Sequence, residues 1–167
     1  MTELLYQTDS YLKEFRARVS AMDTDKRAVV LDRSAFYPGG GGQPCDLGTL
    51  EVGAITYPVV KVMKGDAGIL HVLGGEDALP EVGSPVLGKV DWARRHALMR
   101  THTALHILCG VVFRDYGAHV TGGDMDPLKG RMDFEFETMS KELVAVIEAA
   151  VNREVQSGHE IRVAILP

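Results

Sequence analysis

The stretch DWARRHALMRTHTALHILCGVVFRDYG, residues 91–117, separates two regions of different composition and decides which fold to expect. Asp91 can cap a helix that begins at Trp92 and continues to about Tyr116, because a carboxylate accepts hydrogen bonds from the free N–H groups of a first turn. Gly117 suits the end of this helix. Apolar residues at helical spacing supply one face: Leu98, Met99, Leu105, Leu108, Cys109, Val112 and Phe113. We therefore expect one long amphipathic helix in the middle of the chain.

The region before this helix has the pattern of short strands. Phe15, Ala17 and Val19 alternate with charged residues, which is typical of a strand with one buried face. Further apolar runs lie at 28–31, 49–52, 55–63 and 69–73, separated by glycines, and 79–88 resembles a loop that leads into a last strand. Short strands with regular turn signals are typical of a small barrel or sandwich. We predict a small N-terminal β-barrel over residues 1–90.

The region after the helix combines helix and strand patterns. Residues 131–137 alternate between apolar and charged side chains, as in a half-buried strand, whereas 117–125 has the composition of a loop. Ser140 can cap a second helix that ends at Gly158. The expected inner face of that helix is Leu143, Val144, Ile147, Ala150, Val151 and Val155, and a further strand is expected at Ile161, Val163 and Ile165. Residues 91–167 are thus predicted to be α+β, with helices packed on an antiparallel sheet. Because the chain stops at the last strand, we expect this domain to be incomplete at its C-terminus.

Composition limits the class of protein. The chain has 167 residues, of which 46% are hydrophobic and 25% charged, as in ordinary globular domains. No apolar run reaches the roughly 20 residues of a membrane helix. Two cysteines give no disulfide framework and fit a reducing cytosol, so we expect a cytoplasmic protein. The formal net charge of -5 argues against a broad nucleic-acid surface but allows a local basic patch.

His102 and His106 are the clearest candidates for chemistry. Residues four apart lie on one face of a helix, so the two imidazoles can bind one metal ion, with zinc the first choice. No glutamate follows His102, which excludes the metalloprotease pattern H-E-x-x-H. The alternative is that one ring packs in the core and the other faces water. A zinc site needs three or four protein ligands, and the remaining candidates are Cys45, Cys109, His71, His96, His119 and His159.

A run of four glycines, 39–42, is the second candidate. Glycine permits backbone conformations closed to other residues and lets a ligand approach the main chain. Gln43 and Asp46 follow and can offer an amide and a carboxylate to a small polar ligand. A phosphate-binding P-loop is excluded, because no Gly-Lys-Ser/Thr ending follows. The alternative is a flexible turn between two strands.

Five motifs in order give the chain a specific resemblance. They are Gly-Gly-Gln-Pro-x-Asp-x-Gly at 41–48, His-Thr-Ala-Leu-His at 102–106, Gly-x-His-Val at 117–120, Arg-x-Asp-Phe at 131–134 and Val-Ile-Glu-x-x-Val-Asn at 146–152. Together they resemble the editing domain of alanyl-tRNA synthetases, and most of all the free-standing AlaX proteins of medium length. These relatives carry an N-terminal β-barrel before the metal-binding domain.

The resemblance implies a zinc-dependent deacylase. Such proteins hydrolyse the ester of Ser-tRNA(Ala), and in some cases Gly-tRNA(Ala), and spare Ala-tRNA(Ala). His102 and His106 would be two of four zinc ligands. The family supplies the other two from a Cys-x-x-x-His motif, which this chain lacks: Thr49 and Phe113 stand four places after its two cysteines.

The resemblance also implies binding residues. Gly41, Gly42, Gln43 and Thr101 are the expected substrate contacts, since polar partners for the serine hydroxyl would reject alanine. Contacts with tRNA phosphates are expected from Arg94, Arg95, Arg100 and Arg114, on or near the long helix, and the alternative for each is an ordinary solvated helix residue. No general base is identified. Two alternatives stay open: a non-catalytic module that binds tRNA or another subunit, and the editing portion of an alanyl-tRNA synthetase.

Overall fold

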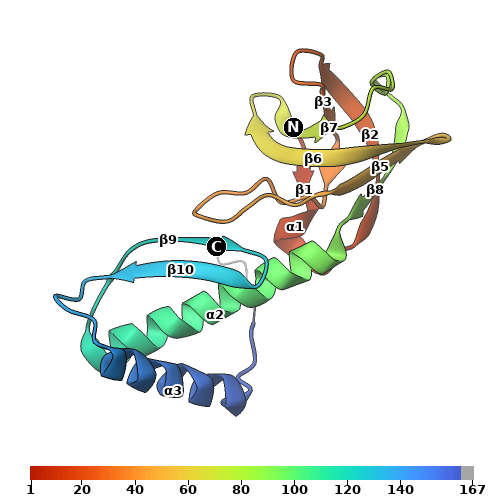
Figure 1. Ribbon diagram of the computed structural model, residues 1–167. Coiled ribbons are helices and arrows are strands. Elements are labelled where there is room, and N and C mark those ends of the chain that lie inside the picture. Colours follow the sequence, from red (N-terminus) through yellow and green to blue (C-terminus); the bar gives the residue numbers. More distant parts are fainter. Residues whose placement is uncertain (163–167) are drawn as a thin grey trace. The chain divides into compact units, whose positions relative to one another are not determined.

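The computed structural model describes residues 1–162 and divides the chain into two compact units, Met1–Leu98 and Met99–Pro167 (Figure 1). Helix α2 (Trp92–Tyr116) begins in the first unit and ends in the second. The sequence places the domain boundary at residue 90, where the composition changes, and that boundary stays a prediction.

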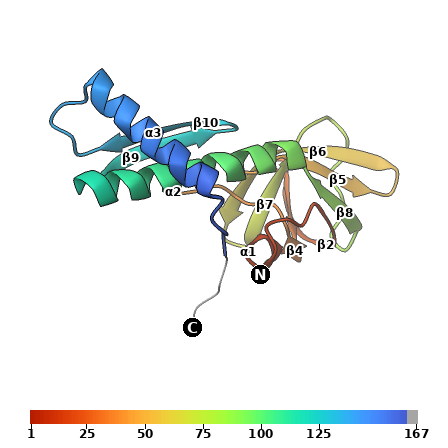
Figure 2. The ribbon, with the colours of Figure 1, turned by 90° about the horizontal axis from the view of Figure 1, so that it is seen from below.

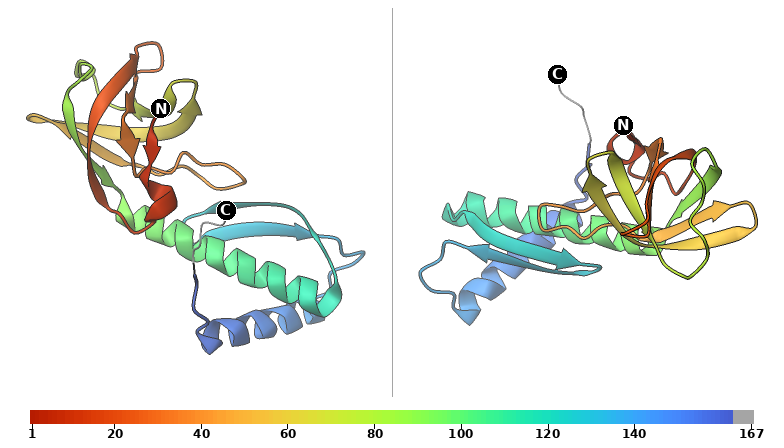
Figure 3. Two further views of the ribbon diagram at one scale, coloured as in Figure 1. Left: turned by 180° about the vertical axis from the view of Figure 1, so that it is seen from behind. Right: turned by 90° about the horizontal axis from the view of Figure 1, so that it is seen from above.

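The first unit contains a closed antiparallel barrel, whose ring of strands can be followed in the two views of Figure 3. The strands are paired in the order β2–β3–β7–β6–β5–β8, and β8 closes the ring by pairing with β2. Their bounds are β2 (Glu14–Asp23), β3 (Ala28–Leu31), β5 (Gly48–Val52), β6 (Ile55–Gly65), β7 (Gly68–Leu73) and β8 (Pro85–Val90). The predicted barrel is confirmed.

Alternation along the strands produces the barrel interior. In β2, Phe15, Ala17 and Val19 are buried while Arg16 and Arg18 point to solvent, as the period of two requires. The buried side chains form one apolar core that includes Val29, Leu31, Phe36, Leu50, Val59, Val62 and Leu73. Three short elements complete the unit: β1 (Glu3–Leu4), α1 (Leu5–Thr8) and β4 (Arg33–Ser34), with β1 parallel to β4.

The second unit contains the C-terminal part of α2, the antiparallel pair β9 (Val120–Asp126) and β10 (Lys129–Phe134), and helix α3 (Lys141–Ser157). Figures 1 and 2 show α3 and the hairpin packed along this part of α2. Val112 on α2 and Ile147 on α3 share a core with Phe134 and Phe136. The α+β class is confirmed, since helices pack on an antiparallel sheet.

The helix ends follow the expected signals. The Asp91 carboxylate accepts a hydrogen bond from the Arg94 N–H at 3.0 Å, and the Ser140 hydroxyl accepts one from the Leu143 N–H at 3.1 Å. Gly117 and Gly158 end α2 and α3 with φ of 68° and 62°, in the left-handed region that glycine adopts without strain.

Several details differ from the sequence prediction. Residues 117–125 were predicted as loop, but most of them belong to strand β9, because pairing with β10 outweighs the low strand propensity of its glycines. Phe113, Val144 and Val155 were expected on inner helix faces but are 53%, 45% and 54% exposed, so each helix buries a narrower stripe than its apolar residues suggest. Of the predicted last strand, Ile161 is exposed and outside any strand, while Val163 and Ile165 lie outside the described residues. No helix among residues 1–162 is long and apolar enough to span a bilayer.

Candidate functional site

The imidazoles of His102 and His106 converge on the surface of α2. Their Nε2 atoms are 3.0 Å apart and their ring centroids 4.6 Å apart. Because one ring nitrogen cannot donate to another that also carries a proton, this approach requires either one shared N–H or a cation held between two lone pairs. The alternative of one buried ring and one solvated ring is not what the structure has: His102 is half-buried, His106 is exposed, and the rings face each other.

The spacing of these nitrogens is close to that in a zinc site. Two imidazole ligands at 2.0–2.1 Å from a tetrahedral ion are separated by roughly 3.3 Å. The pair therefore has the chemistry and geometry of two zinc ligands. Within residues 1–162, no third His, Cys, Asp or Glu completes a group that could hold a metal. Residues 1–162 thus bring two candidate metal ligands together.

The environment of His102 favours its neutral, ligand-ready form. Partial burial lowers the pKa of His102, and the neighbouring His106 lowers it further, because a second positive charge beside the first is unfavourable. A neutral imidazole is the form that binds metal. The two rings have no hydrogen-bond partner but each other among the described residues.

The turn of helix that carries His102 and His106 packs against the β9–β10 hairpin. The Thr101 hydroxyl, which is buried, donates a hydrogen bond to the Asp126 carbonyl oxygen at 3.2 Å. The side chain of Leu105 packs against Gly130 so closely that a Cβ there would lie 3.0 Å from it. Thr101 therefore anchors the helix to the hairpin, and its hydroxyl proton is already used within the protein.

The four glycines form the tip of a tight hairpin in the first unit. Gly40 and Gln43 exchange backbone hydrogen bonds at 3.0 and 3.1 Å, which leaves Gly41 and Gly42 as the two central residues of the turn. Their φ angles are 61° and 79°, the positive values that a type I′ turn requires at both positions. The Gln43 side chain is half-buried and has no hydrogen-bond partner in the described part of the chain. The run is thus an ordered turn whose exposed backbone and one free amide could meet a ligand.

A buried ion pair fastens the base of this turn. Asp46 Oδ1 accepts a hydrogen bond from Arg95 Nε at 3.2 Å, and Oδ2 accepts the Tyr37 N–H at 2.6 Å and also pairs with Arg95 Nη2. The same guanidinium donates to the carbonyl oxygens of Ala35 and Leu12. Both side chains are about 5% exposed. Asp46, considered above as a ligand contact, and Arg95, considered as a tRNA contact, instead hold the two ends of the turn together.

A second buried polar pair supports the strand that enters the turn. His71 Nδ1 lies 3.2 Å from the Val29 carbonyl oxygen, which can only accept, so the proton is on Nδ1 and Nε2 accepts from the Ser34 hydroxyl at 2.7 Å. The Ser34 oxygen in turn accepts the Phe36 N–H at 3.1 Å. Ser34 and His71 are fully buried. This arrangement resembles a Ser–His dyad, but no substrate can reach it, so it serves the fold.

The other arginines predicted to bind tRNA lie in different surroundings. Arg94 is half-buried and donates to the Cys45 carbonyl oxygen at 3.3 Å. Arg100 is exposed on α2, as a phosphate contact requires. Arg114 forms ion pairs with Asp115 and Glu154, so its charge is already compensated. Of the four, Arg100 is the best placed for a phosphate.

Sequence reasoning missed one group of basic residues. Arg16, Arg18 and Arg33 line a surface cavity on the barrel. The alternation that predicts strand 14–23 also predicts that Arg16 and Arg18 point outward side by side, so the signal was present in the pattern of β2.

Comparison with known proteins identifies the family. A model of class II (A) tRNA synthetases matches residues 5–94. The alanyl-tRNA editing protein AlaX-M of Methanosarcina acetivorans is 39% identical over 99% of this chain and 70% of its own length, and the one of Saccharolobus solfataricus is 39% identical over 100% and 70%. The alanine–tRNA ligase of Pyrobaculum aerophilum is 41% identical over 99% of this chain, which spans 19% of that enzyme. This chain therefore belongs to the family of alanyl-tRNA editing proteins.

Proposed function

We propose that this chain is a cytoplasmic deacylase that hydrolyses the aminoacyl ester of tRNA(Ala) charged with serine, and to a smaller extent with glycine. The observation that carries the proposal is the convergence of His102 and His106 Nε2 at 3.0 Å within a motif of the editing family. An activated ester needs little chemical help, so a site that binds, orients and selects the substrate is sufficient.

A zinc ion held by His102 and His106, with further ligands from elsewhere, would polarise the ester carbonyl or lower the pKa of a bound water. The residues of this chain do the rest. The helix holds both imidazoles at fixed separation, and the Thr101 bond to Asp126 fixes that turn of helix. Within the first unit, and independently of how the two units are placed, we assign the free amide of Gln43 and the exposed turn at Gly41 and Gly42 to substrate binding.

Selectivity follows from hydrogen bonding. Serine differs from alanine by one hydroxyl, and a site built to bind that hydroxyl can reject the analogue lacking it by about 10⁴-fold, because its polar groups would be left unpaired. Gln43 fits this role, since its side chain has no partner within the described protein. Glycine lacks both the hydroxyl and the methyl group, so we expect slower turnover of Gly-tRNA(Ala).

The test is deacylation by the full-length natural protein. Ser-tRNA(Ala), Gly-tRNA(Ala) and Ala-tRNA(Ala) are incubated with it at equal concentration, and loss of the ester is followed over time. We expect rapid loss from Ser-tRNA(Ala) and none above background from Ala-tRNA(Ala). The substitution His102→Ala should abolish the activity and His96→Ala should not, since His96 is an exposed histidine on the same helix. Equal or absent turnover of the seryl and alanyl esters would contradict the proposal.

Metal analysis separates the deacylase from a non-catalytic module. One tightly bound zinc per full-length chain, lost in His102→Ala, supports the enzyme. A metal-free protein that binds tRNA without hydrolysing the ester supports the module.

A second candidate is the editing portion of an alanine–tRNA ligase, which the 41% identity to the ligase of Pyrobaculum aerophilum favours. The chemistry proposed for the site is the same in both cases. Aminoacylation of tRNA(Ala) with alanine by the natural protein would distinguish the ligase from a separate editing protein.

A further inference from the structure

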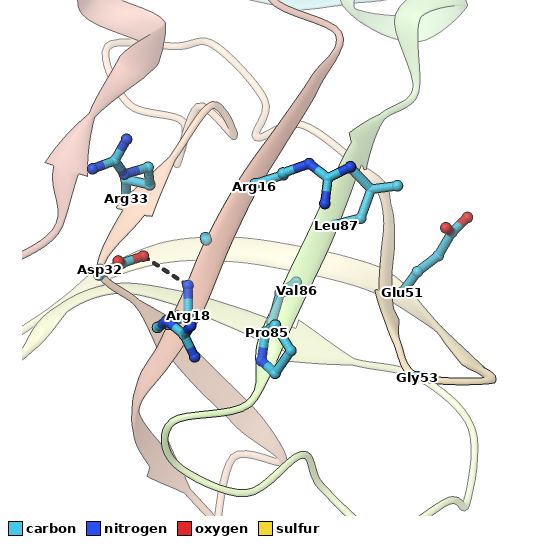
Figure 4. A pocket seen from close by; sticks show the side chains of 10 residues that line it. Arg16, Arg18, Asp32, Arg33, Glu51, Gly53, Pro85, Val86 and Leu87 are labelled. Atoms are coloured by element: carbon cyan, nitrogen blue, oxygen red, sulfur yellow. Dashed lines mark hydrogen bonds between the residues drawn. The ribbon is translucent and has the colours of Figure 1, made fainter.

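A groove on the outside of the barrel carries a cluster of arginines that neither the predicted site nor the family motifs include (Figure 4). Its volume is about 490 Å³. The floor is the antiparallel ladder of β2 and β8, in which Arg16 lies opposite Leu87 and Arg18 opposite Pro85. Side chains two apart on a strand share a face, so both arginines project from the floor. Arg33 from β4 lies beside β2, on the side away from β8, as Figure 4 shows.

Three arginines in the groove face two carboxylates, of which one is already paired. Glu51 pairs with Lys89 at 2.6 Å, whereas Asp32 accepts the backbone N–H of Arg18 at 2.8 Å and keeps its negative charge. The side chain of Arg16 has no ion-pair or hydrogen-bond partner among residues 1–162, and only its backbone is paired, in the ladder with β8. The groove is therefore a place where an added anion finds available donors.

The charges of the other two guanidinium groups, Arg18 and Arg33, are only weakly compensated by their partners. Arg18 donates through Nη1 to the Gly83 carbonyl oxygen at 3.0 Å, an uncharged acceptor that leaves its charge uncompensated. Arg33 Nε is 3.4 Å from Glu3, in a pair whose side chains are 49% and 60% exposed. Such solvent-exposed pairs contribute little and can be exchanged for a stronger anion. A phosphate diester is such an anion, since arginine binds it with two parallel N–H···O bonds.

We propose that this groove, defined by Arg16, Arg18 and Arg33, binds the phosphate backbone of tRNA. The inference rests on the proposed function, which supplies tRNA as the partner. The net charge of the chain is -5, so binding of tRNA requires a local basic surface. The three arginines of the groove provide such a surface. Leu87 and Pro85 add an apolar floor between the charges, which suits a ribose or base beside the phosphates.

The test measures binding of uncharged tRNA(Ala) to the full-length protein at several salt concentrations, so that it does not depend on hydrolysis. The triple variant Arg16→Gln, Arg18→Gln, Arg33→Gln should bind on the order of tenfold more weakly at low salt, and the slope of log K against log salt should fall by roughly two. The matched control is Lys26→Gln, Lys61→Gln, Lys64→Gln, which removes the same charge from other exposed positions of the barrel. The control should bind nearly as wild type does.

A second variant guards against loss of folding. Arg16→Glu changes a side chain without a partner, so the thermal midpoint should be unaltered while tRNA affinity falls. In deacylation, both groove variants should raise KM and leave kcat near that of wild type. If a folded triple variant binds tRNA with unchanged affinity and an unchanged salt slope, the groove does not bind tRNA, even if the protein still hydrolyses the ester. If the wild type hydrolyses none of the esters but its tRNA binding still depends on the three arginines, the proposed deacylase activity is wrong and the proposed tRNA-binding groove is supported.

Discussion

The barrel interior and the exposed face of α2 both bring histidine next to a polar partner, but they leave these groups in opposite states. In the buried part of the first unit, the members of the Ser34–His71 pair and of the Asp46–Arg95 pair hydrogen-bond to each other and to the neighbouring backbone. On α2, His102 and His106 face each other across 3.0 Å with no other partner in the described chain. The hydrogen-bonding groups of the buried pairs are thus occupied within the protein, whereas the ring nitrogens of His102 and His106 are available to a ligand.

This difference is a guide to function. Buried polar groups must be paired, because an unpaired one costs free energy comparable to a lost hydrogen bond, so their presence alone does not indicate a site. A pair of imidazoles on a surface helix has no such requirement, because water can satisfy ring nitrogens that are exposed. The Ser–His geometry of the barrel is therefore the less informative of the two, although it resembles a catalytic dyad more closely.

The largest expected effect comes from breaking the buried ion pair. Asp46→Ala leaves the Arg95 guanidinium buried without a counter-charge, so we expect a loss of about 3–5 kcal/mol in the free energy of unfolding. Urea unfolding of the variant and wild type measures it. The double variant Asp46→Leu, Arg95→Met should recover part of the loss, because apolar replacement removes the uncompensated charge. A loss below about 1 kcal/mol in Asp46→Ala would show that the pair does not hold the barrel and turn together.

The second effect is a pH dependence that originates in the barrel alone. Burial lowers the pKa of His71 to about 4, from the ordinary 6.5. Below pH 6.5 the unfolded chain takes up a proton that the folded chain refuses until about pH 4, so stability is complete above 6.5 and falls as the pH drops through this window. The loss amounts to roughly 3 kcal/mol. Unfolding free energies measured from pH 7.5 to 4 in wild type and His71→Gln isolate it, since carboxylates titrate equally in both. Parallel curves would contradict the buried neutral imidazole.

The third and smaller effect compares a glycine in a packed region, Gly48, with a glycine in an open turn, Gly41. A Cβ on Gly48 would lie 2.1 Å from the Lys89 carbonyl oxygen and 2.9 Å from the Phe36 ring. A Cβ on Gly41 would have no atom within 4 Å, and only its φ of 61° opposes a side chain. We expect Gly48→Ala to destabilise the barrel by about 2–3 kcal/mol through overpacking, and Gly41→Ala by about 1 kcal/mol through backbone strain. Thermal unfolding of both variants compares them, and equal midpoints would mean that the ladder beside Gly48 shifts freely.

The sequence predicted most of the elements because their signals are local. Alternation in 14–23, capping by Asp91 and Ser140, and the glycines after both helices are each determined by residues within a few positions. Strand β9 was missed because two glycines weaken its propensity, and only its partner β10 makes it a strand. The exposure of Phe113 could not be foreseen either, since it depends on how far α3 reaches along α2.

The candidate site was predictable in part for the same reason. His102 and His106 are one helical turn apart, so their convergence follows from helix geometry. The roles of Arg95 and Asp46 do not, because they lie 49 positions apart in the chain and meet only once the barrel has formed. Arginine on a helix predicts a phosphate contact equally well whether it faces water or a buried carboxylate, and tertiary structure decides between them.

The smallest expected effect tests the open pair itself. Without metal, His102→Ala should change the free energy of unfolding by no more than about 0.5 kcal/mol, because the His102 ring is only half-buried, hydrogen-bonds only to His106 among the described residues, and alanine favours the helix. Added zinc should raise the thermal midpoint of the wild type and leave that of His102→Ala unchanged, since only a ligand that binds the folded state stabilises it. His96→Ala should respond to zinc as wild type does. A large loss of stability in metal-free His102→Ala would mean that the fold itself requires the imidazole pair, and the contrast between the saturated barrel and the open helix face would then disappear.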